Sequence, residues 1–216
     1  MGNTETQVTE TQVSETESKI TRSRICGCKD FYIAKITQND ATGYVTETPV
    51  KLARAIKAKI DEKWTSEKIY SDDAPEEVIN SYEGTDVELE INALAPQDRA
   101  LLFGQLYENG FLVKSADDQA PEVAIGWRER QLNKKYVFRW LYVGKFGEGI
   151  SEESQTKEGK ISPTTKTIKG SFYERAIDNR YEISVDESNL VDENTDAKTA
   201  ITNWFSKVQE KDKAKE

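Results

Sequence analysis

The stretch 83–110 constrains the fold of this 216-residue chain more than any other, because its hydrophobic period changes within it. The first part alternates strictly, with Val87, Leu89 and Ile91 on one side and three carboxylates on the other. That period of two predicts a strand with its apolar side in a core and its acidic side facing away from the core. The acidic side consists of Asp86, Glu88 and Glu90.

A short helix is predicted directly after this strand, over about 96–107. Pro96 suits the first helical turn, where its missing N–H is not needed, and Asp98 places a negative charge near the helix N-terminus. Leucines follow at helical spacing, and Asn109-Gly110 is the predicted stop. We expect this helix to pack its leucines on the sheet, over an aromatic strand at 136–142. The unit contains no catalytic constellation.

Further strands are predicted wherever β-branched and aromatic residues concentrate or polarity alternates, at 29–37, 50–60, 122–130, 135–146, 164–174 and 180–185. A helix competes at 50–60, because Ala, Lys and Arg are good helix formers, but the alternation there favours a strand. The segment 135–146 is apolar on both faces, which predicts a strand covered on both sides. A C-terminal helix is predicted over about 197–208, with a stripe of Ile201, Trp204, Phe205 and Val208.

The segment 61–82 is long and charged, yet it contains six large apolar or aromatic side chains. A connection of this length is usually functional, and apolar residues within a charged loop suit a protein contact surface. We therefore predict a long loop that contacts another subunit. The alternative is a hairpin extension whose apolar residues pack on its own base. The contact candidates are Trp64, Ile69, Tyr70, Val78, Ile79 and Tyr82.

Composition argues against most catalytic chemistry. The chain has no histidine, which removes Ser–His and Cys–His nucleophile pairs and histidine metal ligands. Cys26 and Cys28 supply at most half of a zinc site, and no further cysteine exists to complete it. A net charge of −9 argues against a nucleic-acid-binding surface, which needs clustered Lys and Arg. We expect no enzyme activity, no catalytic residues, no cofactor and no metal.

The termini differ in composition from the centre. The segment 1–24 is polar, repeats the sequence TETQV, and is expected to be either disordered in the monomer or an extended arm that docks on a neighbour's sheet edge. A β domain is expected over 25–186. The segment 187–216 is expected to hold an acidic linker, the C-terminal helix and a solvated tail. No stretch approaches the roughly 18 apolar residues of a membrane span, and the N-terminus lacks the apolar core of a secretory signal.

The order of these features resembles the major tail proteins of long-tailed, non-contractile bacteriophages, the subunits that stack into a tail tube. The resemblance covers roughly 29–185. It rests on Tyr82-Glu83-Gly84, Val87-Glu88-Leu89-Glu90-Ile91, Leu101-Leu102-Phe103-Gly104, Glu108-Asn109-Gly110, Val123-Ala124-Ile125-Gly126, the aromatic run Tyr136-Val137-Phe138-Arg139-Trp140-Leu141-Tyr142, and the polar turn 156–163 before Thr165.

The resemblance implies a mainly β subunit, a β-sandwich or open barrel with one packed helix. In that family six subunits form a ring, and rings stack through long loops and terminal arms into a tube. The implied partners are other copies of the chain, a tape-measure protein, tail terminator and baseplate proteins, and DNA in transient passage. The implied location is the virion tail, and the host cytoplasm during assembly. A baseplate or receptor-contacting module of a phage tail is the alternative function.

Within this resemblance the acidic strand has a candidate role. Like charge opposes adhesion of phosphate groups, so Asp86, Glu88 and Glu90 are predicted to face a lumen through which DNA slides. The same carboxylates could instead pair with Lys57 and Lys59 of a neighbouring strand and leave a nearly neutral surface.

Overall fold

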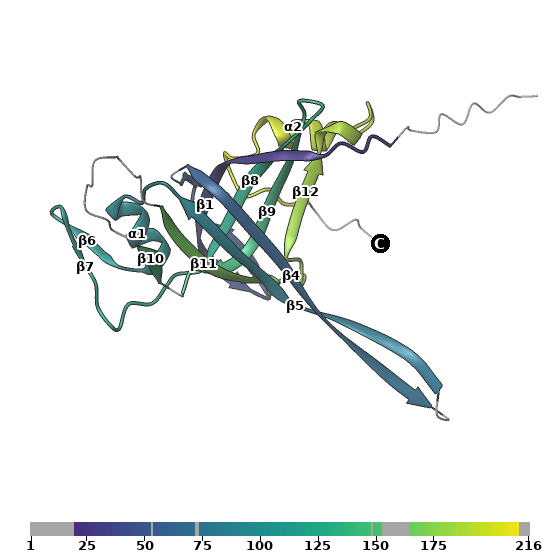
Figure 1. Ribbon diagram of the computed structural model, residues 1–216, viewed down its shortest axis with the longest axis horizontal. Coiled ribbons are helices and arrows are strands. Elements are labelled where there is room, and N and C mark those ends of the chain that lie inside the picture. Colours follow the sequence, from purple (N-terminus) through teal and green to yellow (C-terminus); the bar gives the residue numbers. More distant parts are fainter. Residues whose placement is uncertain (1–19, 53, 72–73, 148, 153–164, 212–216) are drawn as a thin grey trace, which may run out of the picture.

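The computed structural model describes residues 20–52, 54–71, 74–147, 149–152 and 165–211, and the dominant feature of these residues is a ten-stranded antiparallel sheet. Its main path runs β2-β1-β8-β9-β11-β5-β4, while β3, β10 and β12 pair with β1, β11 and β9 (Figure 1). The strands are β1 (Ile25–Asp40), β2 (Gly43–Thr46), β3 (Val50–Lys51), β4 (Ala55–Ser71), β5 (Ala74–Ile91), β8 (Val123–Gln131), β9 (Tyr136–Lys145), β10 (Ile150–Glu152), β11 (Lys166–Tyr173) and β12 (Glu182–Asp186).

The mainly β class and most predicted strands are confirmed. The segments 29–37, 122–130, 135–146, 164–174 and 180–185 overlap β1, β8, β9, β11 and β12. The competing helix at 50–60 does not form, since β3 and the first part of β4 occupy that segment. The expectations for 1–19 and for the 156–163 turn concern residues outside the described part of the chain.

The sheet curls around a first hydrophobic core, and the acidic strand contributes to it as predicted. Val87, Leu89 and Ile91 of β5 are at most 1% exposed there. Ile33 of β1 and Ile60 of the edge strand β4 reach the same core, although β8, β9, β11 and β5 lie between β1 and β4 along the sheet. This closure gives the curled, barrel-like arrangement seen in Figure 1.

A second hydrophobic core lies on the opposite side of β1, β8 and β9. The large aromatic residues Phe138, Trp140 and Tyr142 of β9 point into it, whereas Leu141 points into the first core. Strand β9 is therefore covered on both sides, as its sequence predicted. The cover over the second core is the segment after α2 (Thr195–Thr202), which contributes Trp204 and Val208.

The first predicted helix packs a leucine on the sheet as expected, but it does not lie over the aromatic side of β9. Helix α1 (Pro96–Phe103) contributes Leu102 and Phe103 to the first core and none of its residues to the second. It lies beside β10, to which it is tied by an ion pair between Arg99 and Glu152. The aromatic outer side of β9 is left to the C-terminal segment.

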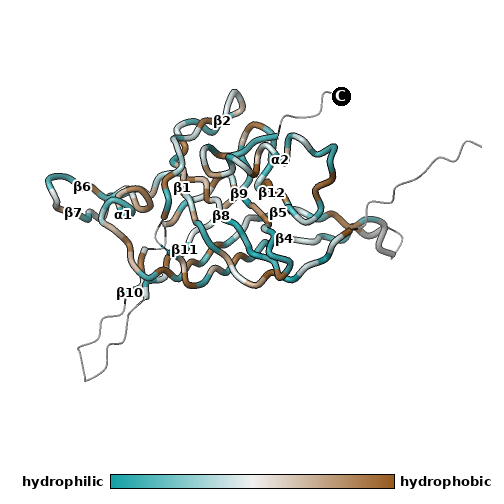
Figure 2. Tube along the Cα trace, turned by 90° about the horizontal axis from the view of Figure 1, so that it is seen from above, coloured by the Kyte–Doolittle hydropathy of each residue, from teal (hydrophilic) through white to brown (hydrophobic). Residues whose placement is uncertain are grey.

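Helix α1 also ends earlier than the predicted 96–107. Gly104 adopts the left-handed conformation (φ 69°), and its N–H donates to the carbonyl of Ala100, so the helix stops there. Asn109-Gly110 instead forms the two-residue turn between β6 (Leu106–Glu108) and β7 (Phe111–Val113), with φ of 50° and 85°. Positive φ at both positions is the requirement of a tight hairpin turn. This hairpin extends away from the sheet next to α1 in both views (Figures 1 and 2).

The C-terminal helix is likewise shorter than the predicted 197–208. After Thr202 the chain turns, and Trp204, Phe205 and Val208 reach the second core outside the helix. The carbonyl of Trp204 accepts a hydrogen bond from the indole N–H of Trp140, at 3.1 Å. Tertiary contacts of Trp204 thus determine the path of the chain after the first two helical turns.

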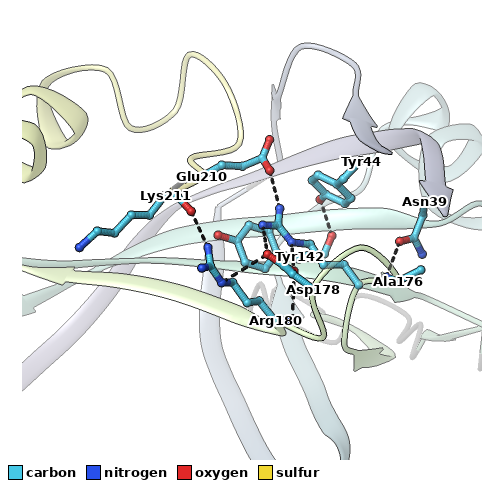
Figure 3. A network of polar contacts seen from close by, with 9 residues as sticks. Asn39, Tyr44, Tyr142, Ala176, Asp178, Arg180, Glu210 and Lys211 are labelled. Atoms are coloured by element: carbon cyan, nitrogen blue, oxygen red, sulfur yellow. Dashed lines mark hydrogen bonds and ion pairs between the residues drawn. The ribbon is translucent and has the colours of Figure 1, made fainter. Parts of the chain in front are cut away.

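A buried arginine, Arg175, fastens this C-terminal segment to the sheet through Asp178 and Glu210, which are labelled in Figure 3 together with Tyr142. Arg175 is 3% exposed, donates to both carboxylate oxygens of Asp178 at 2.6 and 2.7 Å, and donates to Glu210 at 2.5 Å. Its guanidinium lies 4.3 Å from the ring centroid of Tyr142. The hydrogen bonds from Arg175 lower the pKa of Asp178, and burial raises the pKa of Tyr142 to about 12.

No helix in the described ranges has both the length and the apolar content that crossing a membrane requires.

Candidate functional site: a projecting arm and a charged face

Strands β4 and β5 continue well beyond the rest of the sheet and form a two-stranded arm, residues 64–71 and 74–82 (Figure 1). β5 pairs with β11 only over 85–91, so the outer part of β5 is paired with β4 alone. The predicted loop at 61–82 is therefore wrong in its local structure. The hairpin of the alternative is confirmed, and its antiparallel pairing satisfies the backbone of this charged segment, but only some of its apolar residues pack on the base.

The arm leaves the sheet at a bulge centred on Glu83. Lys63 is opposite Gly84 while Trp64 is opposite Tyr82, which leaves Glu83 without a partner in the register. Gly84 has φ of 144°, and a Cβ at this position would lie 2.9 Å from the carbonyl oxygen of Phe172. Only glycine fits this backbone without strain. Glycine is thus required at the point where the arm leaves the sheet.

Two of the six contact candidates pack at the base of the arm. The Trp64 ring meets the Tyr82 ring edge-on, with 5.3 Å between the ring centroids, and the Tyr82 ring stacks on the Tyr181 ring, with 4.1 Å between the centroids. The Tyr82 hydroxyl also lies 2.7 Å from Oγ1 of Thr85. This is the packing on its own base that the alternative described, although Trp64 remains 52% exposed.

The outer candidates do not pack on the base. Ile69, Val78 and Ile79 are 44%, 51% and 46% exposed, while the side chain of Tyr70 lies outside the described part of the chain. The register places Glu67 opposite Ile79 and Ile69 opposite Glu77, so one face of the arm presents these two isoleucines and two glutamates together. Exposed apolar side chains on a ribbon with unpaired edges are a surface for protein contact.

The three predicted lumen residues lie on a charged face, the outward side of β4, β5 and β11. Asp86, Glu88 and Glu90 alternate with the buried residues of β5. The register places Glu88 between Lys59 of β4 and Lys169 of β11, and Glu90 opposite Lys57. The charged face has equal numbers of acidic and basic residues: Asp61, Asp86, Glu88, Glu90, Lys57, Lys59, Lys63 and Lys169.

The contacts within this face are specific and mostly exposed. Asp86 forms an ion pair with Lys63 and accepts from the Ser171 hydroxyl at 3.0 Å. The hydrogen bond from Lys63 lowers the pKa of Asp86. Glu90 accepts from the Thr165 hydroxyl at 2.8 Å. Lys63 and Lys169 were not predicted as partners of the carboxylates. Lys63 is an even number of positions from Lys57 and Lys59, so the sequence indicates that the three lie on one face of the strand. Their acidic partners, however, can be assigned only from the strand register.

A second charged surface was missed entirely. The basic clusters at 22–24 and 130–135 are far apart in the chain, but β1 pairs with β8 so that Gly27 is opposite Arg130. The N–H of Leu132 donates to the carbonyl of Arg24 at 2.9 Å. The available signal was the presence of two short Arg- and Lys-rich segments in an acidic chain.

The described residues contain no group of three His, Cys, Asp or Glu that could hold a metal ion. Cys26 is exposed and Cys28 is half-buried, and burial raises the pKa of the Cys28 thiol. Neither a scan against protein-family models nor a search of the curated proteins found a match to this chain. The described residues present three candidate binding surfaces: the arm, the charged face and the basic surface formed around 22–24 and 130–135.

Proposed function

We propose that this chain is a structural subunit that assembles into stacked rings, forming the tail tube of a long-tailed, non-contractile phage. The observation that carries the proposal is the arm, which places exposed Ile69, Val78 and Ile79 on a two-stranded ribbon beyond the sheet. Open strand edges and exposed apolar side chains are liabilities in a monomer, and a closed or stacked assembly removes them. The arm is thus the candidate contact between rings.

The charged face is the candidate lining of the lumen. Its carboxylates are balanced by lysines, so the face is nearly neutral and offers phosphate groups no continuous positive surface. Passage of DNA would then depend on balanced charge rather than on repulsion by the carboxylates alone. A density map of the assembled tube that placed Asp86, Glu88 and Glu90 on the exterior would reject this role for the face.

The experiment that tests assembly is electron microscopy of the concentrated purified protein, in which we expect rings or tubes. A variant with Ile69, Val78 and Ile79 all changed to Thr keeps the strand propensity of the arm but removes its apolar contacts. We expect it to remain folded and to form no tubes. The matched control, Ser66→Thr with Asn80→Thr, changes exposed arm positions of the same two strands and should assemble normally. Tubes of normal length from the triple variant would contradict the role of the arm.

A receptor- or baseplate-contacting module is the second candidate, and one observation favours it. Trp64, Tyr82 and Tyr181 form an aromatic cluster beside a hollow of about 370 Å³ that includes Glu62 and Asn179. Aromatic rings next to polar groups suit a carbohydrate or protein ligand. Under this alternative the same microscopy would show discrete globular particles, and Trp64→Ala would abolish ligand binding while leaving the oligomeric state unchanged.

A further inference from the structure

One end of the sheet is strongly basic in a chain whose net charge is −9. This basic end is formed by the residues before and at the start of β1 together with the turn between β8 and β9. Its six cationic residues are all exposed: Arg22, Arg24, Lys29, Arg130, Lys134 and Lys135. In the part of the chain that the structure describes, none of the six forms an ion pair with a carboxylate.

The carboxylates around the basic end form no ion pair with its six cationic residues in the described part of the chain, although Asp186 lines the same hollow as Arg22 and Arg24 and accepts a hydrogen bond from the Gln131 amide at 3.1 Å. Asp30 pairs with Lys51 and Arg128. Glu187 accepts from the backbone N–H of Tyr136 at 2.9 Å. The six cations therefore exceed the two carboxylates Asp186 and Glu187, and the excess positive charge is available to a partner.

The basic end also exposes apolar side chains among its cations. Ile25 is 54% exposed and Leu132 is 66% exposed. Ile25 is opposite Gln131 in the β1–β8 register, so it lies next to the strand residue that precedes Leu132. A surface that combines cations with a large aliphatic pair suits a partner that combines carboxylates with aliphatic residues.

The arm has this complementary chemistry. The sequence 64–82 contains five acidic residues and one lysine. One face of the arm presents Glu67 and Glu77 beside Ile69 and Ile79, and all four side chains are exposed. Figure 1 shows the arm projecting from the lower side of the sheet, away from the turn between β8 and β9 at the upper side. The arm of one copy therefore cannot reach the basic end of the same copy.

We propose that the basic end is the docking surface for the acidic arm of a second copy of this chain. Each copy has one arm and one docking surface at separate places, so the contact is head-to-tail and repeats along a stack. The inference rests on the proposed function and identifies the surface that receives the arm. A second copy fits better than a nucleic acid, because the exposed Ile25 and Leu132 match the isoleucines of the arm and offer nothing to phosphate.

Charge reversal on each side, separately and together, tests the contact. The docking variant is Arg130→Glu with Lys134→Glu, and the arm variant is Glu67→Lys with Glu77→Lys. Each should raise the concentration needed for assembly by roughly tenfold or more, since like charges then face each other. The chain with both pairs reversed restores complementarity and should return to within about threefold of the wild type. The control, Lys35→Glu with Lys207→Glu, removes the same charge from exposed sites elsewhere and should not change assembly.

Assembly is measured by sedimentation velocity and microscopy at low and high salt, after circular dichroism confirms the fold of each variant. Weaker wild-type assembly at high salt is expected, because exposed charges are screened. If the docking variant forms tubes at the same protein concentration as the wild type, the proposed contact is wrong, while the tube function is not contradicted. In that case, loss of duplex DNA binding in the same variant would indicate that the basic end binds the phosphate groups of a nucleic acid. Failure of the double reversal to restore assembly would also overturn it. The wild type could instead form only short oligomers that each single reversal weakens and the combined reversal restores. That result would support this contact and contradict the proposed tube.

Discussion

The two outer faces of the curled sheet differ in how they meet their surroundings. The outer side of β1, β8 and β9 is aromatic, and the chain covers it with its own C-terminal segment, fastened by Arg175. The outer side of β4, β5 and β11 is charged, and the described part of the chain places no segment over it. The same sheet thus has a covered face that serves stability and a bare face that continues into the arm.

Substitutions on the two faces should therefore act on different properties, stability on the covered face and assembly on the bare face. Side chains under the C-terminal cover lose buried contacts when they are truncated, so they should change the free energy of unfolding. Side chains of the bare face and arm are hydrated in the monomer, so they should change assembly with little effect on unfolding. Matched residues occur on both sides and allow direct tests.

The largest expected effect comes from the two tryptophans. Trp204 is 1% exposed under the cover, and Trp204→Ala should cost about 3–5 kcal/mol of unfolding free energy, as for other buried aromatic truncations. Trp64 is 52% exposed at the base of the arm, and Trp64→Ala should cost about 1 kcal/mol or less. Chemical denaturation of the monomer measures both. Equal costs would break the distinction between the covered face and the arm.

A smaller effect is expected at the point where the arm leaves the sheet. Gly84→Ala places a Cβ near the carbonyl oxygen of Phe172 at a φ that L-residues rarely adopt, and should cost about 1–3 kcal/mol. Because Gly84 adjoins the bulge at which the arm leaves the sheet, we expect the variant to misdirect the arm and to assemble poorly even under conditions where it is folded. Gly27→Ala is the control: a Cβ there meets nothing within 4 Å, so stability should change by about 0.5 kcal/mol or less. Normal tubes from Gly84→Ala would show that the bulge does not orient the arm.

The sequence predicted the fold where the hydrophobic pattern was local to one strand. The alternation of Val87, Leu89 and Ile91 identified the core side of β5, and the two-sided apolar pattern of 135–146 identified a strand covered on both faces. Both patterns depend only on which side of a strand each residue occupies.

The errors arose where a long-range partner or a competing local signal decided the outcome. Gly104 ended α1 before Asn109-Gly110 could, and that pair became a hairpin turn. The arm has exposed apolar residues on both faces, so its strands showed no core-facing alternation, and only pairing between β4 and β5 reveals them. The basic end joins segments about a hundred positions apart, because β1 pairs with β8. No single stretch of sequence contained that pairing.

The smallest expected effect is the difference between Asp178 and Asp86 in how much each carboxylate contributes to the free energy of unfolding as the pH falls. Hydrogen bonds from Arg175 lower the pKa of Asp178, whose side chain is 5% exposed, and a hydrogen bond from Lys63 lowers the pKa of Asp86, whose side chain is 46% exposed. A lowered pKa in the folded state means that the unfolded chain binds protons first as the pH falls. The stabilisation is therefore complete above the ordinary aspartate value of about 3.9 and is lost as the pH falls through the lowered value.

Replacing each carboxylate with an amide should separate the two faces. Asp178→Asn should lose about 1–3 kcal/mol of unfolding free energy at pH 7, because Arg175 keeps its burial and loses a charged partner. Its stability should then fall less steeply than that of the wild type between about pH 5 and pH 2, so that the two curves converge in acid. Asp86→Asn should change stability by about 0.5 kcal/mol or less at any pH, since solvent screens its pair with Lys63. Denaturation curves collected across this pH range decide the matter: equal losses at pH 7 would mean that the charged face contributes as much to the monomer as the fastened C-terminus, and would weaken its assignment to contacts outside the subunit.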